Sequence, residues 1–249
     1  MLKGFIALVF LTALTAISMP TFAGGSYGRK ICSGSKYTCY RVKGHDTWER
    51  LFPNPLEKEI VKSVNRINTL LRRGMIIAIP KNLSTVGYMD VSPFPRRIEP
   101  RGYKFVLISV SLHAFGAYDK FGYLLHWGPI SGGKGWCPDL GSACNTPIGT
   151  FHMKYKGNAN CVSKKFPVGI GGAPMYYCMF FYGGYAMHSS FLPGHHASHG
   201  CIRLFHEDAK WLNENFITTG KDGTKVIVKA ALIPMKERMG LGIASIQVV

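Results

Sequence analysis

A cysteine flanked by histidine and glycine is the part of this chain best suited to chemistry. It lies in the segment SHGCIRL, residues 198–204, and His188 precedes it in the sequence. A free cysteine is mostly protonated at neutral pH, and an adjacent imidazole can accept its proton to give the nucleophilic thiolate. The glycine before Cys201 allows a tight turn, in which the amides of Gly200 and Cys201 can face a carbonyl substrate. The pattern predicts a cysteine nucleophile for acyl transfer.

The number of cysteines points to the same residue. The chain has seven cysteines, and an odd number in an exported protein leaves one thiol unpaired. The sequence alone does not fix the connectivity, but pairing neighbours predicts three disulfides: Cys32–Cys39, Cys137–Cys144 and Cys161–Cys178. Cys201 is then the free thiol, and the alternative is a buried cysteine that only packs.

The N-terminus predicts export. Lys3 precedes an apolar run over about residues 4–17, and small residues flank a predicted cleavage point after Ala23, so residues 1–23 are typical of a secretory signal peptide. The apolar run is shorter than the ~20 residues of a spanning helix, and an uncleaved anchor is the alternative. We expect an oxidising compartment in which disulfides form.

The charge favours an anionic partner. The formal net charge is +17, which attracts anionic polymers and surfaces over a long range. Export and the lack of a nucleic-acid-binding motif argue against nucleic acid. A cell-wall polymer or a membrane surface is the expected partner, and the alternative is that the charge only keeps the protein soluble.

The first third of the chain predicts a small α/β module. Residues 24–39 form a basic segment with two cysteines, and residues 81–102 form a linker rich in proline and arginine. Between them we expect, in this order, a strand at 40–42, a helix capped by Asp46-Thr47, a helix over 56–65 and a strand over 75–79.

From residue 103 the pattern predicts a mainly β domain with one or two helices over 103–230, followed by a tail over 231–249. We expect strands at 105–110, 114–118, 122–127, 146–151, 176–181, 185–188 and 224–228, a loop at 129–134 and a helix at 205–215.

Three segments of this β-rich part resemble the L,D-transpeptidase catalytic domain, the YkuD-type fold. They are SGGK at 131–134, TPIGTF at 146–151, and His188 with SHGCIR at 198–203. The resemblance implies a β-sandwich whose cysteine takes an acyl group from a peptidoglycan stem peptide, at the bond between meso-diaminopimelate and D-Ala. An amine then attacks the thioester. The resemblance also implies inhibition by carbapenems, and no cofactor is expected.

The resemblance implies roles for the residues around the thiol. Cys201 matches the nucleophile, and His188 matches the general base, whose ring the carbonyl of Ser189 would orient. The amides of Gly200 and Cys201 would hold the oxyanion. His199 matches a motif histidine that shapes the pocket.

Two further residues of the motif are expected to bind or to position. Arg203 matches an arginine of many Gram-negative members, and its guanidinium would bind a stem carboxylate. Ser198 would position the loop by hydrogen bonding. This match favours the periplasm of a Gram-negative bacterium, with secretion as the alternative.

The chain departs from the family pattern near the site. Nine residues separate His188 from Ser198, fewer than the family usually has, and Ser189 stands where many members have glycine. The segment between Cys137 and Cys144 is an addition, which we expect to form a disulfide-pinned lip near the cleft.

Residues 40–80 resemble a LysM module, which implies binding of N-acetylglucosamine-containing glycans such as peptidoglycan. His45 replaces the usual glycine, and two prolines, Pro53 and Pro55, lie between the matching positions. No individual glycan-contacting residue is identified, and a packing module without a ligand is the alternative. The matching residues are Tyr40, Val42, Asp46, Thr47, Asn65, Asn68, Leu70, Gly74, Ile77, Ile79 and Pro80.

The sequence therefore predicts a cysteine acyltransferase of the cell wall: a peptidoglycan L,D-transpeptidase with a role in wall biogenesis and cell shape. An L,D-carboxypeptidase, with water as the acceptor, is a close alternative, and a non-catalytic wall-binding protein is another. We expect no metal, because the cluster lacks the fixed ligand spacing of structural zinc sites, although it is dense enough to suggest zinc. The cluster comprises His188, His195, His196, His199, Cys201 and His206.

Overall fold

The structure, a computed structural model, describes residues 26–165 and 173–232. The predicted signal peptide, residues 1–23, lies outside the described residues, as do residues 233–249 of the predicted tail. Among the described residues, no helix is both long and apolar enough to cross a bilayer.

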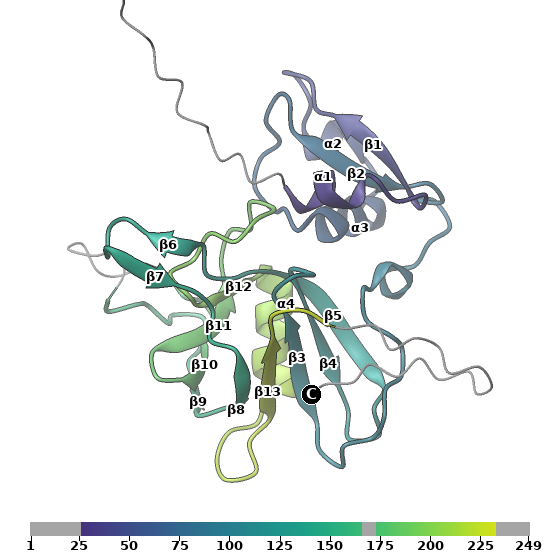
Figure 1. The fold of residues 1–249 in the computed structure, drawn as a ribbon. Helices are drawn as coiled ribbons and strands as arrows, with labels where there is room; N and C mark the ends of the chain where they lie inside the picture. Colours follow the sequence, from purple (N-terminus) through teal and green to yellow (C-terminus); the bar gives the residue numbers. More distant parts are fainter. Residues whose placement is uncertain (1–25, 166–172, 233–249) are drawn as a thin grey trace, which may run out of the picture.

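The N-terminal module is a two-stranded sheet covered by short helices (Figure 1). Strands β1 and β2 pair antiparallel and enclose two helices in the chain, while α1 precedes them. The elements are α1 (Tyr27–Ile31), β1 (Tyr37–Arg41), α2 (Trp48–Leu51), α3 (Pro55–Asn65) and β2 (Ile76–Pro80).

Local capping explains the two central helices. The side chain of Thr47 accepts from the amide of Arg50 at 3.1 Å, so the predicted cap is confirmed. Asn54 caps α3 in the same way and Pro55 occupies its first turn, where a missing amide costs nothing. A proline that departs from the LysM pattern therefore starts a helix here. Arg66 ends α3 in the left-handed region, with φ of 61°.

The C-terminal part is one curled sheet of nine strands, in the order β8-β13-β3-β4-β5-β12-β11-β10-β9. A separate hairpin of β6 and β7 projects from it (Figure 1). The strands are β3 (Phe105–Ser109), β4 (Ala114–Tyr118), β5 (Leu124–Ser131), β6 (Gly135–Cys137), β7 (Ser142–Cys144), β8 (Gly149–His152), β9 (Tyr155–Lys156), β10 (Met179–Tyr182), β11 (Tyr185–Ser189), β12 (Ile202–Leu204) and β13 (Lys225–Lys229).

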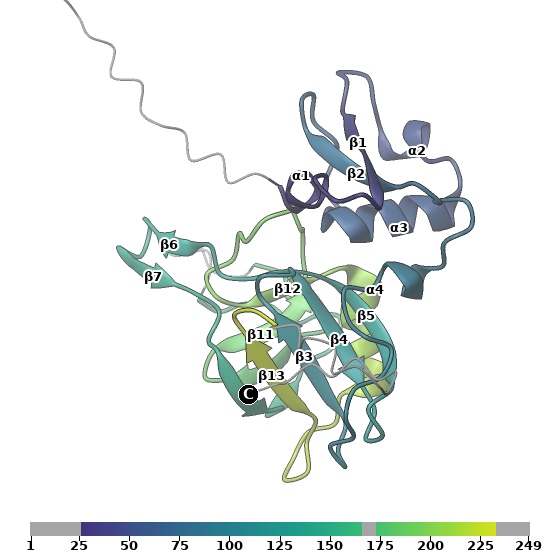
Figure 2. The same cartoon turned by 45° about the vertical axis from the view of Figure 1, so that its right-hand side comes forward.

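The sheet curls around one helical segment. Helix α4 (His206–Trp211) continues into a π-helical turn, η2 (Leu212–Phe216), and together they span residues 206–216, close to the predicted helix at 205–215. One buried cluster joins Ala209 of α4 to Val106 of β3 and Met187 of β11, strands from opposite halves of the sheet. The sheet must curl to bring both halves onto the same helix, as Figures 1 and 2 show.

Two expectations for this domain were wrong. The predicted loop at 129–134 begins as strand, because β5 runs to Ser131, where Ile130 and Ser131 pair with β12 and are buried. Strand β12 itself was missed, since it has only three residues and lies within the motif.

The structure contains three disulfides, which join the sequence neighbours. They are Cys32–Cys39, Cys137–Cys144 and Cys161–Cys178. All seven cysteines lie in the described part of the chain, and Cys201 is the one left free.

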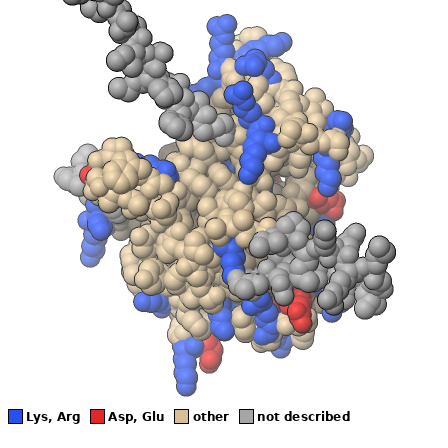
Figure 3. Space-filling model, in the orientation of Figure 1, with Lys and Arg blue, Asp and Glu red and all other residues tan. Residues whose placement is uncertain are grey.

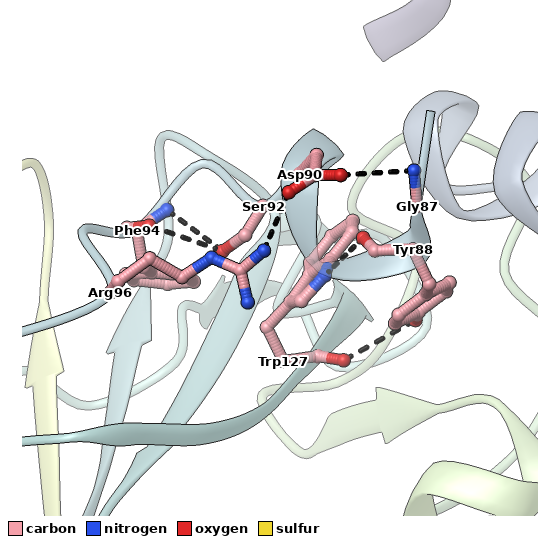
Figure 4. A network of polar contacts seen from close by, with 7 residues as sticks. All are labelled: Gly87, Tyr88, Asp90, Ser92, Phe94, Arg96 and Trp127. Carbon is pink, nitrogen blue, oxygen red and sulfur yellow. Dashed lines mark hydrogen bonds and ion pairs between the residues drawn. The ribbon is translucent and has the colours of Figure 1, made fainter. Parts of the chain in front are cut away.

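The segment expected to be a linker is docked on the β domain rather than extended. It contains a short 3-10 helix, η1 (Tyr88–Val91). Trp127 donates its indole N–H to the carbonyl of Tyr88 at 3.0 Å, and the hydroxyl of Tyr88 donates back to the carbonyl of Trp127 at 3.3 Å (Figure 4). Asp90 pairs with Arg96 at 2.6 Å and accepts from the amide of Gly87.

A buried arginine joins the module to the β domain. Arg66 is 3% exposed, and its Nε donates to the carbonyl of Leu112 at 3.2 Å. Its guanidinium lies 4.5 Å from the ring centre of Tyr27 and 5.2 Å from that of Trp127. A buried charge destabilises the fold unless it keeps such partners. Separating the two parts would remove them from Arg66, so the contact favours the docked arrangement.

Basic side chains are spread over the face of the molecule that Figure 3 shows. In Figure 3, lysines and arginines project from many places on the visible face, and acidic side chains are few. On this face the positive charge is therefore distributed over the surface rather than gathered in a single basic groove. Such a distributed charge attracts polyanions over a long range.

The contact between His113 and His196, near the junction of the module and the β domain, predicts that the folded protein loses stability in acid. Their rings stack at 3.8 Å, and burial together with the nearby basic groups lowers the pKa of His113 to about 3. Between about pH 3 and the unfolded value of 6.5, the unfolded chain binds the extra proton, so stability is lost as the pH falls through this window.

Thermal unfolding measured from pH 7 to pH 4 checks this expectation. His113→Asn removes the titrating ring, and asparagine tolerates the left-handed φ of 48° found there. Its melting temperature should fall less with acid than that of the wild type. Parallel curves for the two proteins would show that His113 does not carry the effect.

Candidate active site

Two adjacent parallel strands bring the candidate residues together. Strands β11 and β12 pair so that Met187 lies beside Ile202 and His188 lies beside Arg203. Met187 and Ile202 are fully buried in the core. Because side chains alternate along a strand, His188 and Arg203 project from the opposite face, and Cys201 precedes β12 on that side.

His188 is held in one tautomer. Its Nδ1 lies 3.0 Å from the carbonyl oxygen of Ser189, which can only accept, so Nδ1 carries the proton and Nε2 is left as an acceptor. This is the contact expected of the Ser189 carbonyl. Burial lowers the pKa of His188 to about 4, against the opposing effect of this hydrogen bond. The ring is therefore neutral at pH 7 and able to take a proton.

The thiol is also neutral at rest. Burial raises the pKa of Cys201, and a backbone hydrogen bond at Ala186 and the charge of Arg203 oppose that shift. Its Sγ lies 3.9 Å from the carbonyl oxygen of Gly184, the acceptor for the thiol proton. The sulfur therefore needs a base to become a nucleophile, rather than standing as a thiolate.

Arg203 has no ion-pair partner among the residues that the structure describes. It is partly buried, and none of the described carboxylates lies within ion-pair distance of it. Arg203 lies beside His188 in the strand register, and its charge lowers the pKa of both His188 and Cys201. An arginine in this position can bind a carboxylate through two parallel hydrogen bonds.

The turn before the thiol is built on Ser198 and Gly200. The Ser198 hydroxyl donates to the carbonyl of Cys201 at 2.5 Å and accepts from the amide of Gly200 at 3.0 Å. Gly200 has φ of +116°, and a β-carbon there would meet the ring of Tyr185 at 2.4 Å, so the position requires glycine.

This turn corrects one expectation. The amide of Gly200 donates to Ser198, so in this geometry it is not free to hold an oxyanion together with the amide of Cys201. The cause is the close side-chain-to-backbone contact within the turn, a common alternative for serine. Ser198 does position the loop by hydrogen bonding, as its expected role requires.

The first two motif segments support the third. The amide of Ser198 donates to the carbonyl of Gly132 at 2.9 Å, and the amide of Lys134 donates to the carbonyl of Ser198 at 2.9 Å. The amide of Gly133 donates to the hydroxyl of Thr146 at 2.9 Å. The segments at 131–134 and 146–151 thus act as a backbone frame for the turn that carries Cys201.

The β6–β7 hairpin contacts the site through one carboxylate. Asp139, in the turn of this hairpin, lies 2.7 Å from Nε2 of His199 and 3.7 Å from Lys134. The contact with His199 lowers the pKa of Asp139. Sequence reasoning missed Asp139, because a single acidic residue in an added loop carries no signal of its own.

One group of possible metal ligands is found near the β6–β7 hairpin. Among the described residues, Cys137, Asp139 and His199 are the set whose ligand atoms lie within 4.8 Å of one another. The sulfur of Cys137 is bonded to Cys144, so it is not available as a thiolate ligand.

Two of the remaining histidines, His196 and His206, have structural partners. His195 is exposed, whereas His196 is half-buried: its Nδ1 accepts from the amide of Gly132 at 2.8 Å and its Nε2 donates to the carbonyl of Val110 at 3.1 Å. His206 begins α4, and its Nδ1 lies 3.1 Å from the hydroxyl of Ser189. That contact was also missed, because it depends on how α4 packs against β11.

Comparison with known proteins identifies the β domain. A sequence model of the YkuD family, described as the L,D-transpeptidase catalytic domain, matches residues 103–228, half of the chain. Comparison with curated proteins gave no significant match.

Three similar solved structures are each described as an L,D-transpeptidase. One from Xylanimonas cellulosilytica is 23% identical over 69% of this chain and 78% of its own, with a TM-score of 0.49. L,D-transpeptidase 1 of Mycobacterium tuberculosis is 28% identical over 51% of this chain, with a TM-score of 0.39, and this chain covers 61% of it, less than two thirds. L,D-transpeptidase 3 of that organism, in complex with a faropenem-derived adduct, is 19% identical over 64% of this chain and 75% of its own, with a TM-score of 0.40.

The matched residues include each of the three motif segments, strand β11, which bears the imidazole, and strand β12, which directly follows the thiol. The chain therefore belongs to the YkuD family, the L,D-transpeptidase catalytic domains.

Proposed function

We propose that this protein is a peptidoglycan L,D-transpeptidase that works through a thioester on Cys201. The donor is a stem tetrapeptide, cleaved between meso-diaminopimelate and D-Ala, and the acceptor is an amine. The observation that carries the proposal is the common face of Cys201, His188 and Arg203 on β11 and β12. Cell-wall biogenesis and the maintenance of cell shape follow from such an activity.

The reaction begins with transfer of the thiol proton. Nε2 of His188 accepts it, and Sγ of Cys201 attacks the carbonyl carbon of diaminopimelate. The tetrahedral intermediate collapses as the imidazolium returns the proton to the leaving D-Ala nitrogen. The acceptor amine then attacks the thioester, gives up its proton through His188, and releases the thiol.

Other residues position and stabilise in this proposal. The amide of Cys201 holds the developing oxyanion, while the amide of Gly200 shapes the turn through Ser198. Arg203 binds a carboxylate of the stem peptide, and His199, held by Asp139, shapes the pocket wall. Such charge-assisted contacts serve binding more than proton transfer.

The N-terminal module is proposed to be LysM-like and to bind the glycan strand. Its element order, β1–α2–α3–β2, and the antiparallel pairing of its strands support this proposal. Several residues of the resemblance hold the module together: Asn65 accepts from the amide of Ala78 and donates to its carbonyl, both at 2.7 Å, and Tyr40 donates to Asp46 at 2.8 Å. The proposed partner is thus peptidoglycan, both glycan and peptide.

Export is the proposed setting for this chemistry. Three disulfides fit an oxidising compartment, and the positive charge fits an anionic wall. We propose that residues 1–23 are removed as a signal peptide and that the protein works in the periplasm of a Gram-negative bacterium.

Incubation of the purified protein with tetrapeptide muropeptides tests the function, with products identified by mass spectrometry. Crosslinked dimers support transfer to an amine. Tripeptides alone would make the protein an L,D-carboxypeptidase. Unchanged tetrapeptides, together with wall binding retained in Cys201→Ala, would make it a non-catalytic wall-binding protein.

The thiol and its base are expected to be required for acyl-enzyme formation. Cys201→Ala should abolish the covalent adduct with a carbapenem, and His188→Ala should slow its formation by at least ~100-fold, the usual contribution of a general base. Intact-mass spectrometry measures the adduct. If the folded wild-type protein forms no adduct, the proposed enzymatic function is wrong.

The rate of acylation should have an unusual acid limb. The reactive form has a neutral imidazole and a neutral thiol, and it persists from the lowered pKa of His188, about 4, up to the raised pKa of Cys201. Acylation rates measured against pH should therefore fall with a midpoint near 4. A midpoint at the ordinary histidine value of 6.5 would contradict the burial of the base.

Arg203→Ala should impair use of the substrate more than reactivity of the thiol. Loss of a charged hydrogen bond lowers kcat/KM for the tetrapeptide by about 10-fold or more. Alkylation of Cys201 by iodoacetamide, a neutral reagent, should change much less. Equal losses in both assays would show that Arg203 acts on the sulfur and not on a carboxylate.

A further inference from the structure

We propose that Asn68 of the N-terminal module is a positioning residue for the active site, so that the catalytic domain depends on the module for its geometry. The proposal rests on the proposed function for its kinetic consequences. It concerns the loop of residues 189–197, which connects His188 to the turn that carries Cys201.

Asn68 binds this loop with backbone and side chain. Its amide donates to the carbonyl of Leu192 at 3.1 Å, and its Oδ1 accepts from the amide of Leu192 at 2.7 Å. Its Nδ2 donates to the carbonyl of Ser190 at 3.2 Å. The carboxamide thus meets one donor and one acceptor of the loop, as a neighbouring strand would.

Neighbouring residues of the module extend the same contact. Ile67 forms a β-bridge with Pro193, and the amide of Tyr27 donates to the carbonyl of Gly194 at 2.7 Å. Gly194 has φ of +86°, and a β-carbon there would come within 2.9 Å of Ile67. The loop therefore lies directly against the module over residues 190–194.

The second half of the loop is held by the β domain. Ser131 donates its hydroxyl to the carbonyl of His195 at 2.8 Å and accepts from the amide of Ala197 at 3.0 Å. The loop is thus fixed between β5 on one side and the module on the other. It begins at Ser189, whose carbonyl orients His188, and it leads into Ser198, which organises the turn before Cys201.

Asn68 is itself rigidly placed. It lies two residues after Arg66, which is buried at the junction and donates a hydrogen bond to the carbonyl of Leu112. The residue after it, Thr69, accepts at its carbonyl from the indole of Trp48 at 2.8 Å. The module can therefore transmit its position to the loop, and a displacement of the loop by about 1 Å is enough to slow an enzyme strongly.

The short loop explains why such a support is needed. Nine residues span from His188 to Ser198, and the module supplies hydrogen bonds to Ser190, Leu192 and Gly194 among them. Backbone groups in a partly buried loop must find partners. Here the amide of Leu192 and the carbonyls of Ser190, Leu192 and Gly194 find theirs in the module.

Asn68→Ala in the full chain tests the proposal, with Asn82→Ala as the matched control, since Asn82 is an exposed asparagine outside this contact. We expect Asn68→Ala to lower the carbapenem acylation rate by about 10-fold to 100-fold. We also expect it to raise the midpoint of the acid limb, because a loosened loop admits water to His188. Hydrogen exchange at residues 189–197 should increase, while the control resembles the wild type.

Gly194→Ala disrupts the same contact from the loop side, because its β-carbon would clash with the side chain of Ile67. It should reproduce the change in rate and in acid limb. If the wild type is acylated and both variants match it in rate, pH profile and exchange, the positioning role of Asn68 is overturned.

A wild type that forms no adduct would overturn the proposed function and leave this contact to be judged by hydrogen exchange alone. Faster hydrogen exchange of the loop in Asn68→Ala would then support the positioning role of Asn68. Unchanged exchange would contradict that role.

Discussion

The parallel pairing of β11 with β12 is the constraint on which the rest of the site depends. It aligns Met187 with Ile202 and His188 with Arg203, so one face of the pair is anchored in the core. A shift by one residue would exchange the two faces and move the imidazole into the core. Burial of the strongly apolar inner face sets the register of the two strands. That register decides which polar groups lie around Cys201 on the outer face.

Burial sets the chemical state of these groups. It lowers the pKa of His188 and raises that of Cys201, so both are neutral at rest and a proton must move before the sulfur can attack. The carbonyl of Ser189 decides which nitrogen of His188 is free to accept. None of the described carboxylates pairs with Arg203, so its charge remains available for an anionic group.

The two parts of the molecule share one structural frame. The docked linker and the buried Arg66 join the module to the β domain, and the loop from His188 to Ser198 lies at that junction. If the module holds a glycan strand, the strand is held by the same body that supports the reactive turn. Binding of the polymer and presentation of the peptide would then be mechanically linked.

Sequence alone determined the parts of this protein that depend on local patterns. The free cysteine, the segments that accompany it, the Thr47 cap, and most strands follow from residue type and spacing, and the pattern of the β-rich half led to its family. Only the tertiary structure decided what depends on distant contacts. Asn68 reaches Leu192 and Asp139 reaches His199, and the Gly200 amide turns to Ser198 instead of the substrate. The physical reason is that these hydrogen bonds form between segments whose separation is set by packing, which no local pattern records.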